Sequence, residues 1–149
     1  MSKKNVHDTW KKLQRVVSKD GRFSMQSYQF IFEALDYTAS QLGKKYNSSI
    51  EQERHVTGQE LSEGIKQFAI EKFGYMTRIV LEQWGITKSG EFGEIVFNLV
   101  DSGLMGKTET DTLDDFKDLY DFYIEFDEKF KFEGTFDFSY SWDLFKNNG

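Results

Sequence analysis

The sequence predicts a mainly helical α+β domain, built as a compact helical bundle with a small C-terminal β element. Residues 54–104 contain three consecutive amphipathic segments with apolar residues at steps of three and four, and each segment ends at a glycine. Residues 130–142 instead alternate aromatic with polar side chains. The first spacing indicates helices and the second indicates strands, so both kinds of element are expected in one domain.

Length and composition limit the class of protein. The 149 residues fit one domain that can bury a sizeable core. The chain has no cysteine, which excludes disulfides, thiolate zinc sites and a cysteine nucleophile. No apolar run approaches the ~20 residues that cross a bilayer, and the first residues lack the apolar segment of a signal peptide. We therefore expect a protein of the reducing cytoplasm, without a membrane partner.

Charge is distributed unevenly along the chain. The formal net charge is −6, but residues 1–19 hold six Lys or Arg and one Asp, which gives +5 and leaves −11 for the remainder. Residues 109–128 hold nine acids and one base, Lys117, and therefore carry −8. Two ends of opposite sign fit either attraction within the monomer or an arm that binds a partner.

The basic N-terminal segment is expected to form a helix over residues 5–18, because Val6, Trp10, Leu13 and Val17 recur at helical spacing. This apolar face is narrow, so docking onto the rest of the protein is favoured over lying on a membrane or binding nucleic acid. Lysine and arginine side chains contact phosphates, and tryptophan stacks on bases. The candidate partner-binding residues of this segment are Trp10, Lys11, Lys12 and Arg15.

A second helix is expected to begin after Ser24, whose side chain suits an N-cap, and to end at Gly43, which suits a left-handed conformation. Phe23 and Tyr28 stand at the positions of a hydrophobic staple. Residues 44–54 are polar and aperiodic, which indicates an exposed loop. The predicted core face of the helix consists of Tyr28, Ile31, Phe32, Leu35 and Leu42.

Two further helices have boundaries that local sequence predicts. Thr57 and Glu60 form a capping box, and Val56 with Leu61 supplies the accompanying staple. The inward residues of this helix are expected to be Leu61, Ile65, Phe68, Ala69 and Phe73, with Gly74 at its end. The helix that follows is expected to bury Met76, Ile79, Val80 and Trp84 and to end at Gly85.

The next helix is expected to have Ser89 as its cap and to bury Phe92, Ile95, Val96, Leu99 and Val100. Gly103 followed by Leu104 suits a Schellman end. Gly64 and Gly93 fall inside helices, where each glycine costs ~1 kcal/mol relative to alanine. We therefore predict a helix–helix crossing at both glycines, and unfolding or loosening of the domain when Gly93 is replaced by Leu.

The C-terminal region combines acids with aromatic residues. An acidic turn is expected to begin at Thr112, and a set of acids follows at helical steps: Asp114, Asp118, Asp121 and Glu125. These acids favour a solvated face over a cation site. The strand pattern of residues 130–142 fits either a hairpin that covers the helical core or a tail that binds a partner's sheet edge. The candidate partner-binding residues here are Asp118, Asp121, Phe136, Phe138, Tyr140 and Trp142.

Several short blocks between residues 22 and 126 occur in a recognisable order: Tyr28, Phe30, Glu33, Ala34 and Leu35; Gly58 to Leu61; Trp84 to Ile86; Phe92 to Val100; Gly103 and Leu104; Lys107 to Glu109; and Tyr120 to Phe122. In these blocks the chain resembles a small uncharacterised family of bacterial conserved hypothetical proteins, found in planctomycetes, verrucomicrobia and other bacteria. The resemblance implies no activity, because the family has none assigned. One departure is Tyr75, where similar sequences place a proline.

A winged helix has the same outline of three helices followed by a hairpin, with residues 90–102 as the recognition helix. Its exposed side chains would be Glu91, Glu94, Asn98 and Asp101, and three acids would be repelled by phosphates. The sequence therefore disfavours DNA binding through this helix. A winged-helix-like body used for protein contacts is compatible with it.

Catalytic and metal-binding patterns are sparse. His55 and Glu51 would share one face only if residues 51–55 were helical, and no third ligand is identifiable. Glu60 and Glu63 are three apart, and the capping box accounts for Glu60. Neither a P-loop nor a dinucleotide-binding glycine motif occurs. We therefore expect no catalytic residue, metal or cofactor.

These observations divide the chain into a basic N-terminal helix or arm (1–19), a helical core domain (20–130) and an aromatic C-terminal strand or tail (131–149). The function that we expect is a non-enzymatic protein-interaction or regulatory module, with another protein as its partner. The alternative is a protein that associates with nucleic acid or the ribosome through the basic N-terminal arm.

Overall fold

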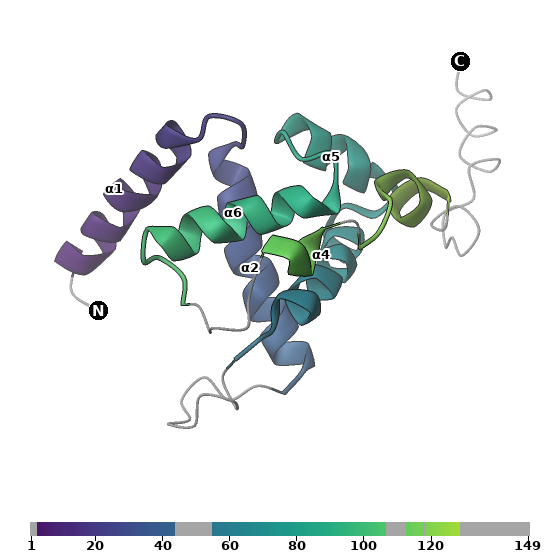
Figure 1. Cartoon of the computed structure of the whole chain (residues 1–149), viewed down its shortest axis with the longest axis horizontal. Coiled ribbons are helices and arrows are strands. Elements are labelled where there is room, and N and C mark those ends of the chain that lie inside the picture. Colours follow the sequence, from purple (N-terminus) through teal and green to yellow (C-terminus); the bar gives the residue numbers. More distant parts are fainter. Residues whose placement is uncertain (1–2, 44–54, 107–112, 118, 129–149) are drawn as a thin grey trace, which may run out of the picture.

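The computed structural model describes residues 3–43, 55–106, 113–117 and 119–128, and this part of the chain is mainly helical (Figure 1). Within these ranges there is no strand, and the expected β element at residues 130–142 lies outside them. The α-helices are α1 (Lys3–Lys19), α2 (Met25–Gln41), α4 (Gly58–Phe73), α5 (Thr77–Gln83) and α6 (Ser89–Asp101). Three short elements complete the fold: η1 (Gly74–Met76), η2 (Leu113–Phe116) and η3 (Tyr123–Glu128).

The core lies around α2, which packs most extensively against α4 and is crossed by α6 (Figure 1). Buried side chains come from every helix, and the aromatic rings of Phe30, Phe68, Phe73 and Trp84 contact one another where α2, α4 and α5 meet. In the described part of the chain, none of the helices is long and apolar enough to cross a membrane.

The predicted starts of α2 and α4 are confirmed. Ser24 Oγ accepts a hydrogen bond from the backbone N–H of Ser27 at 3.3 Å. At α4, the Glu60 N–H donates to Thr57 Oγ1 at 3.1 Å, and the Thr57 N–H donates to Glu60 Oε1 at 3.0 Å. This reciprocal pair satisfies two backbone donors that a helix start leaves unpaired.

The predicted glycine ends are confirmed as well. Gly103 has φ +80°, and the Leu104 N–H donates to the Leu99 carbonyl oxygen at 2.9 Å, as a Schellman end requires. Gly85 has φ +94°, and a Cβ added there would collide with the backbone carbonyl oxygen of Arg22 in the α1–α2 connection. Both positions therefore require glycine.

Three predicted core residues are exposed instead: Leu42, Met76 and Ile79. The α5 prediction was wrong for Met76 and Ile79, whereas Trp84 packs against the core as predicted. Thr77 and Leu81 face inward in place of Met76 and Ile79. Thr77 is buried although it is polar, and its hydroxyl donates to the carbonyl oxygens of Ala69 and Gly74.

Ser89 does not cap α6, which corrects the prediction for this helix start. The N-cap position is Lys88, and its side chain makes no capping bond. Glu91 instead accepts from the backbone N–H and the hydroxyl of Thr87, at 2.9 and 2.8 Å. Ser89 is buried, and its Oγ accepts from the N–H of Leu119 at 3.1 Å, so it holds the later chain against α6.

The two glycines inside helices do lie where another segment approaches. A Cβ on Gly64 would lie 2.8 Å from Thr38 Cβ, which confirms a crossing of α4 with α2. A Cβ on Gly93 would lie 2.9 Å from Phe116 Cβ, so this glycine faces the short turn η2 and not a second long helix. Both distances are shorter than side chains tolerate without movement.

The segment that follows α6 contributes to the core. Phe116, Phe122 and Phe126 are buried, and Phe122 and Phe126 have ring centroids 5.0 Å apart. The expectation of a solvated acidic face is wrong at Glu125, because this carboxylate lies 3.5 Å from the Lys66 ammonium and is largely covered. The first part of the acidic and aromatic C-terminal region, in which we predicted partner-binding residues, therefore packs as part of the helical domain.

Candidate interaction surfaces

Helix α1 docks onto the body by its C-terminal half only. Leu13 is buried, and Val16 and Val17 pack partly buried against the core. Val6 and Trp10 belong to the same helical face but are 55% and 43% exposed. We call Val6 and Trp10 the apolar tip of α1, a helix that lies at the edge of the fold (Figure 1).

A hydrogen-bonded network holds the connection between α1 and α2 against α6. The Asp20 carboxylate accepts from Arg22 Nη2 at 2.7 Å and from Asn98 Nδ2 at 3.0 Å, while Arg22 Nη1 donates to Glu94 at 3.1 Å. The hydrogen bonds from Arg22, with a smaller one from Asn98, keep the pKa of the Asp20 carboxyl well below its usual range. The Asn98 amide also donates to the Tyr28 hydroxyl at 3.0 Å.

This network corrects the expectation that Glu94 and Asn98 project freely from α6. Asn98 is half-buried between α2 and the α1–α2 connection, and Glu94 is paired with Arg22. The network thus joins the α1–α2 connection to α6.

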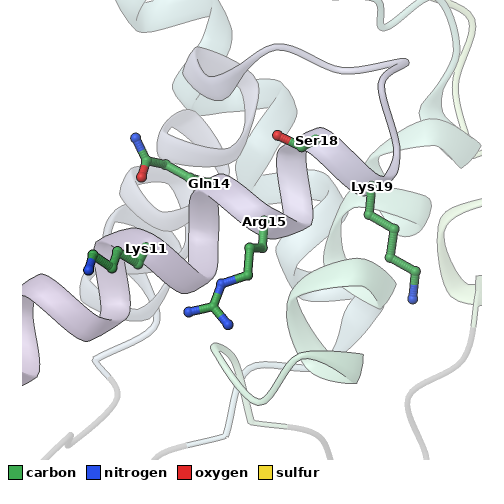
Figure 2. Close-up of a pocket in the computed structure, with 5 residues that line it drawn as sticks. All are labelled: Lys11, Gln14, Arg15, Ser18 and Lys19. Atoms are coloured by element: carbon green, nitrogen blue, oxygen red, sulfur yellow. The ribbon is translucent and has the colours of Figure 1, made fainter.

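The outer side of α1 carries a basic face. Lys11, Gln14, Arg15, Ser18 and Lys19 line a shallow depression along the helix, and all five are exposed (Figure 2). In Figure 2 the side chains of Arg15 and Lys19 extend to one side of the helix, while Gln14 and Ser18 extend to the other. We call these five residues the basic face.

The charges of the basic face lack ion-pair partners in the described part of the chain. Lys11, Arg15 and Lys19 form no ion pair with a described acid, whereas four other cations of the described residues do: Arg22, Lys66, Lys72 and Arg78. Cations at steps of four residues lie on one side of a helix, about 6 Å apart along its axis. The basic face thus offers three aligned positive charges and two neutral hydrogen-bonding side chains.

Lys12, which we predicted as a partner-binding residue, points elsewhere. Its ammonium lies 3.2 Å from where a Cβ on Gly103 would stand, at the C-terminal end of α6. A cation is favoured there because the last carbonyl groups of a helix carry partial negative charge. Lys12 therefore contributes to docking α1, while Lys11 and Arg15 belong to the basic face.

Sequence reasoning did not single out Gln14, Ser18 and Lys19 as site residues. The signal that identifies Lys19 is the regular spacing of Lys11, Arg15 and Lys19, and Gln14 and Ser18 each stand one residue before a cation of this series. The other predicted site residues are not brought to α1. Asp121 is exposed and accepts from the Ile124 N–H at 3.1 Å, at the start of η3. Outside the described residues lie Asp118, Phe136, Phe138, Tyr140 and Trp142.

The described residues contain no group of three or more His, Asp or Glu side chains arranged to hold a metal ion. His7 is exposed on α1, and His55 is half-buried just before α4. Burial raises the pKa of the Tyr120 phenol, which stays protonated and donates to the Ser62 carbonyl oxygen at 3.3 Å. This tyrosine therefore acts as a structural hydrogen-bond donor.

These features define a class of protein: a mainly helical domain with a charged, partly undocked N-terminal helix. Comparison with protein-family models, with curated proteins and with solved structures finds no match for this chain. The resemblance to the bacterial conserved hypothetical family therefore stays a prediction.

Proposed function

We propose that this protein is a non-enzymatic interaction module of the cytoplasm, which binds another protein through the apolar tip of α1. The observation that carries the proposal is the exposure of Val6 and Trp10, one helical turn apart, on a face that is buried further along the same helix. Exposed apolar residues at this spacing are the anchors by which amphipathic helices enter hydrophobic grooves of partner proteins. Tryptophan is also strongly enriched among residues that dominate binding energy.

The geometry of α1 supports a partner that extends the apolar surface on which the helix docks. Leu13 and Val17 occupy the domain's own apolar surface, and the next turns toward the N-terminus present Trp10 and Val6 in line with them. A partner that packs beside the domain would extend this surface and cover the tip. Truncating a buried tryptophan anchor commonly costs 2 kcal/mol or more, which is about a 30-fold loss of affinity.

The test is affinity capture from host cytoplasm by the full chain, with nuclease present and mass spectrometry as the readout. We expect a partner protein that is lost with Trp10→Ala. The matched control is Phe97→Ala, which removes an aromatic side chain of similar exposure from α6. A partner retained equally by both variants, or lost equally with both, would contradict the proposal.

A second candidate function, association with nucleic acid or the ribosome, is favoured by the basic face. Three aligned cations without described acidic partners suit a chain of phosphates. With three phosphate contacts, binding to a single-stranded oligonucleotide would weaken with a log–log salt slope of about −2. Arg15→Gln should reduce that slope by about 0.7. A slope that is unaffected by this substitution would exclude the basic face as the binding site.

We also propose membership of the bacterial conserved hypothetical family, supported by the position of the residues that carry the resemblance. Tyr28, Phe30, Gly58 and Phe92 are buried between helices, so these blocks describe how the domain packs. A family defined by such residues shares a fold. We also propose two finer features of the fold, a C-terminal β element at residues 130–142 and a winged-helix-like arrangement.

A further inference from the structure

A second exposed apolar surface lies at the end of the molecule opposite α1, on elements that pack against each other. Met76 of η1, Ile79 of α5, and Tyr123 and Ile124 of η3 are each between 40% and 56% exposed. We call these four residues the α5–η3 surface. Large apolar side chains gathered on adjoining elements indicate a surface that something covers.

The elements of the α5–η3 surface are held together by charge. Arg78 on α5 donates from Nε to Asp127 of η3 at 2.8 Å, and its Nη1 donates to Glu82 at 2.9 Å. These hydrogen bonds raise the pKa of the Arg78 guanidinium, with Asp127 as the larger cause. The end of η3 is therefore fixed beside α5, and the chain continues from a defined point at Glu128.

The sequence that continues from this point has the pattern that the surface requires. Phe130 and Phe132, then Phe136, Phe138, Tyr140 and Trp142, alternate with polar residues. In extended conformation such a segment has one apolar side, and thirteen residues would reach about 40 Å. The seven-residue helix α5 is only about 10 Å long, so the segment reaches across it with residues to spare.

We infer that the α5–η3 surface is the docking surface for residues 130–142 of the same chain. The argument rests on the exposed apolar side chains, on the exit of the chain beside them and on the aromatic side that a strand pattern would present. It is independent of the function proposed for α1. Intramolecular docking would withhold Phe136, Phe138, Tyr140 and Trp142 from partners, and α1 would then be the surface open to them.

The test uses a spin label on the full chain, because the protein has no native cysteine and Ser141→Cys provides a single attachment point. Isoleucine, leucine and valine methyl signals are recorded with the label oxidised and reduced. We expect the signals of Ile79 and Ile124 to be lost in the oxidised state. Methyl signals of Leu13 and Val16, at the docked half of α1, should be retained.

Matched surface variants of the labelled chain test whether the signal loss depends on the apolar side chains of the α5–η3 surface. Ile79→Glu should restore the Ile124 signal, whereas Phe97→Glu on α6 should leave it absent. Both variants replace an exposed side chain, and an unchanged melting temperature shows that the fold is retained. Retention of both isoleucine signals in the oxidised protein would overturn the inference.

A second copy of the chain is the other occupant that the experiment distinguishes. Labelled chains without isotope are mixed with isotopically enriched chains that carry no label. If the signals are lost only when label and isotope are in the same chain, residues 130–142 dock on their own chain. Signal loss between chains would overturn the inference and assign the α5–η3 surface to self-association.

Discussion

Helices α1 and α4 have nearly the same length, 17 and 16 residues, but they occupy their surroundings differently. Helix α4 buries apolar residues along most of its length, and both of its lysines have acidic partners: Lys66 with Glu63 and Glu125, and Lys72 with Glu33. Helix α1 buries Leu13 alone completely, and the cations of its basic face have no described partner. Helical periodicity therefore predicts a helix, but not whether the helix serves the core or a partner.

The largest expected difference between the two helices comes from removing one apolar side chain from each. Ile65 on α4 is completely buried, so Ile65→Ala should lower the free energy of unfolding by about 2–5 kcal/mol. Val6→Ala on α1 should change it by less than about 0.5 kcal/mol. Urea unfolding measures both values. Equal losses would mean that the tip of α1 is packed in solution.

The next effect concerns how closely α4 approaches its neighbour. Gly64→Ala places a methyl group against Thr38 and should destabilise the protein by about 1–3 kcal/mol. Gly90→Ala is the control, because its added Cβ would meet only the Lys117 Cα, at an ordinary 3.8 Å. It should be neutral or stabilise by up to about 1 kcal/mol, as alanine favours helix. Thermal unfolding that ranks the two variants in the opposite order would refute the close crossing.

A smaller effect is expected where α1 joins the core. Asp20→Asn removes a carboxylate that accepts from Arg22 and Asn98, and should cost about 1 kcal/mol at pH 7. The pKa of this carboxyl is lowered by folding, so its contribution is complete above the unfolded value of about 4. The contribution is lost as pH falls toward the lower pKa of the folded state. Wild type and variant should therefore differ less at pH 3 than at pH 7, and a constant difference would contradict the network.

The smallest effect on stability is expected from the basic face. Lys11→Gln, Arg15→Gln and Lys19→Gln together should change the free energy of unfolding by less than about 0.5 kcal/mol, because exposed cations without partners contribute little. The matched substitution Lys66→Gln on α4 removes two ion pairs, one with a largely covered carboxylate, and should cost more than the triple variant. A large loss in the triple variant would mean that the basic face has acidic partners within the chain.

The fold was predictable where it depends on residues close in sequence. The capping box of Thr57 and Glu60 and the left-handed ends at Gly85 and Gly103 involve partners within five residues. Burial of Thr77 depended on the turn preceding α5, and the role of Ser89 depended on Leu119, thirty residues later. Such contacts are fixed by packing, which periodicity does not encode.

The same distinction applies to the candidate site. The positive charge of Lys11 and Arg15 is a property of the sequence, and both were predicted as binding residues. Their lack of described partners depends on which acids the fold brings near α1, and the assignment of Lys12 to the end of α6 depends on how α1 docks. Charge composition therefore predicted the basic helix, while the structure decided which of its cations face outward.

Phe116, Phe122 and Phe126 belong to the hydrophobic core, and the other buried residues of this core come earlier in the sequence. Asp115 and Phe116 fill the spaces beside Gly58 and Gly93, so these spaces stay open until that segment arrives. A protein is synthesised from its N-terminus, and α2, α4 and α6 therefore leave the ribosome with apolar sides uncovered. Translation must pass Phe126 before the domain closes, and the nascent chain is most vulnerable to aggregation in that interval.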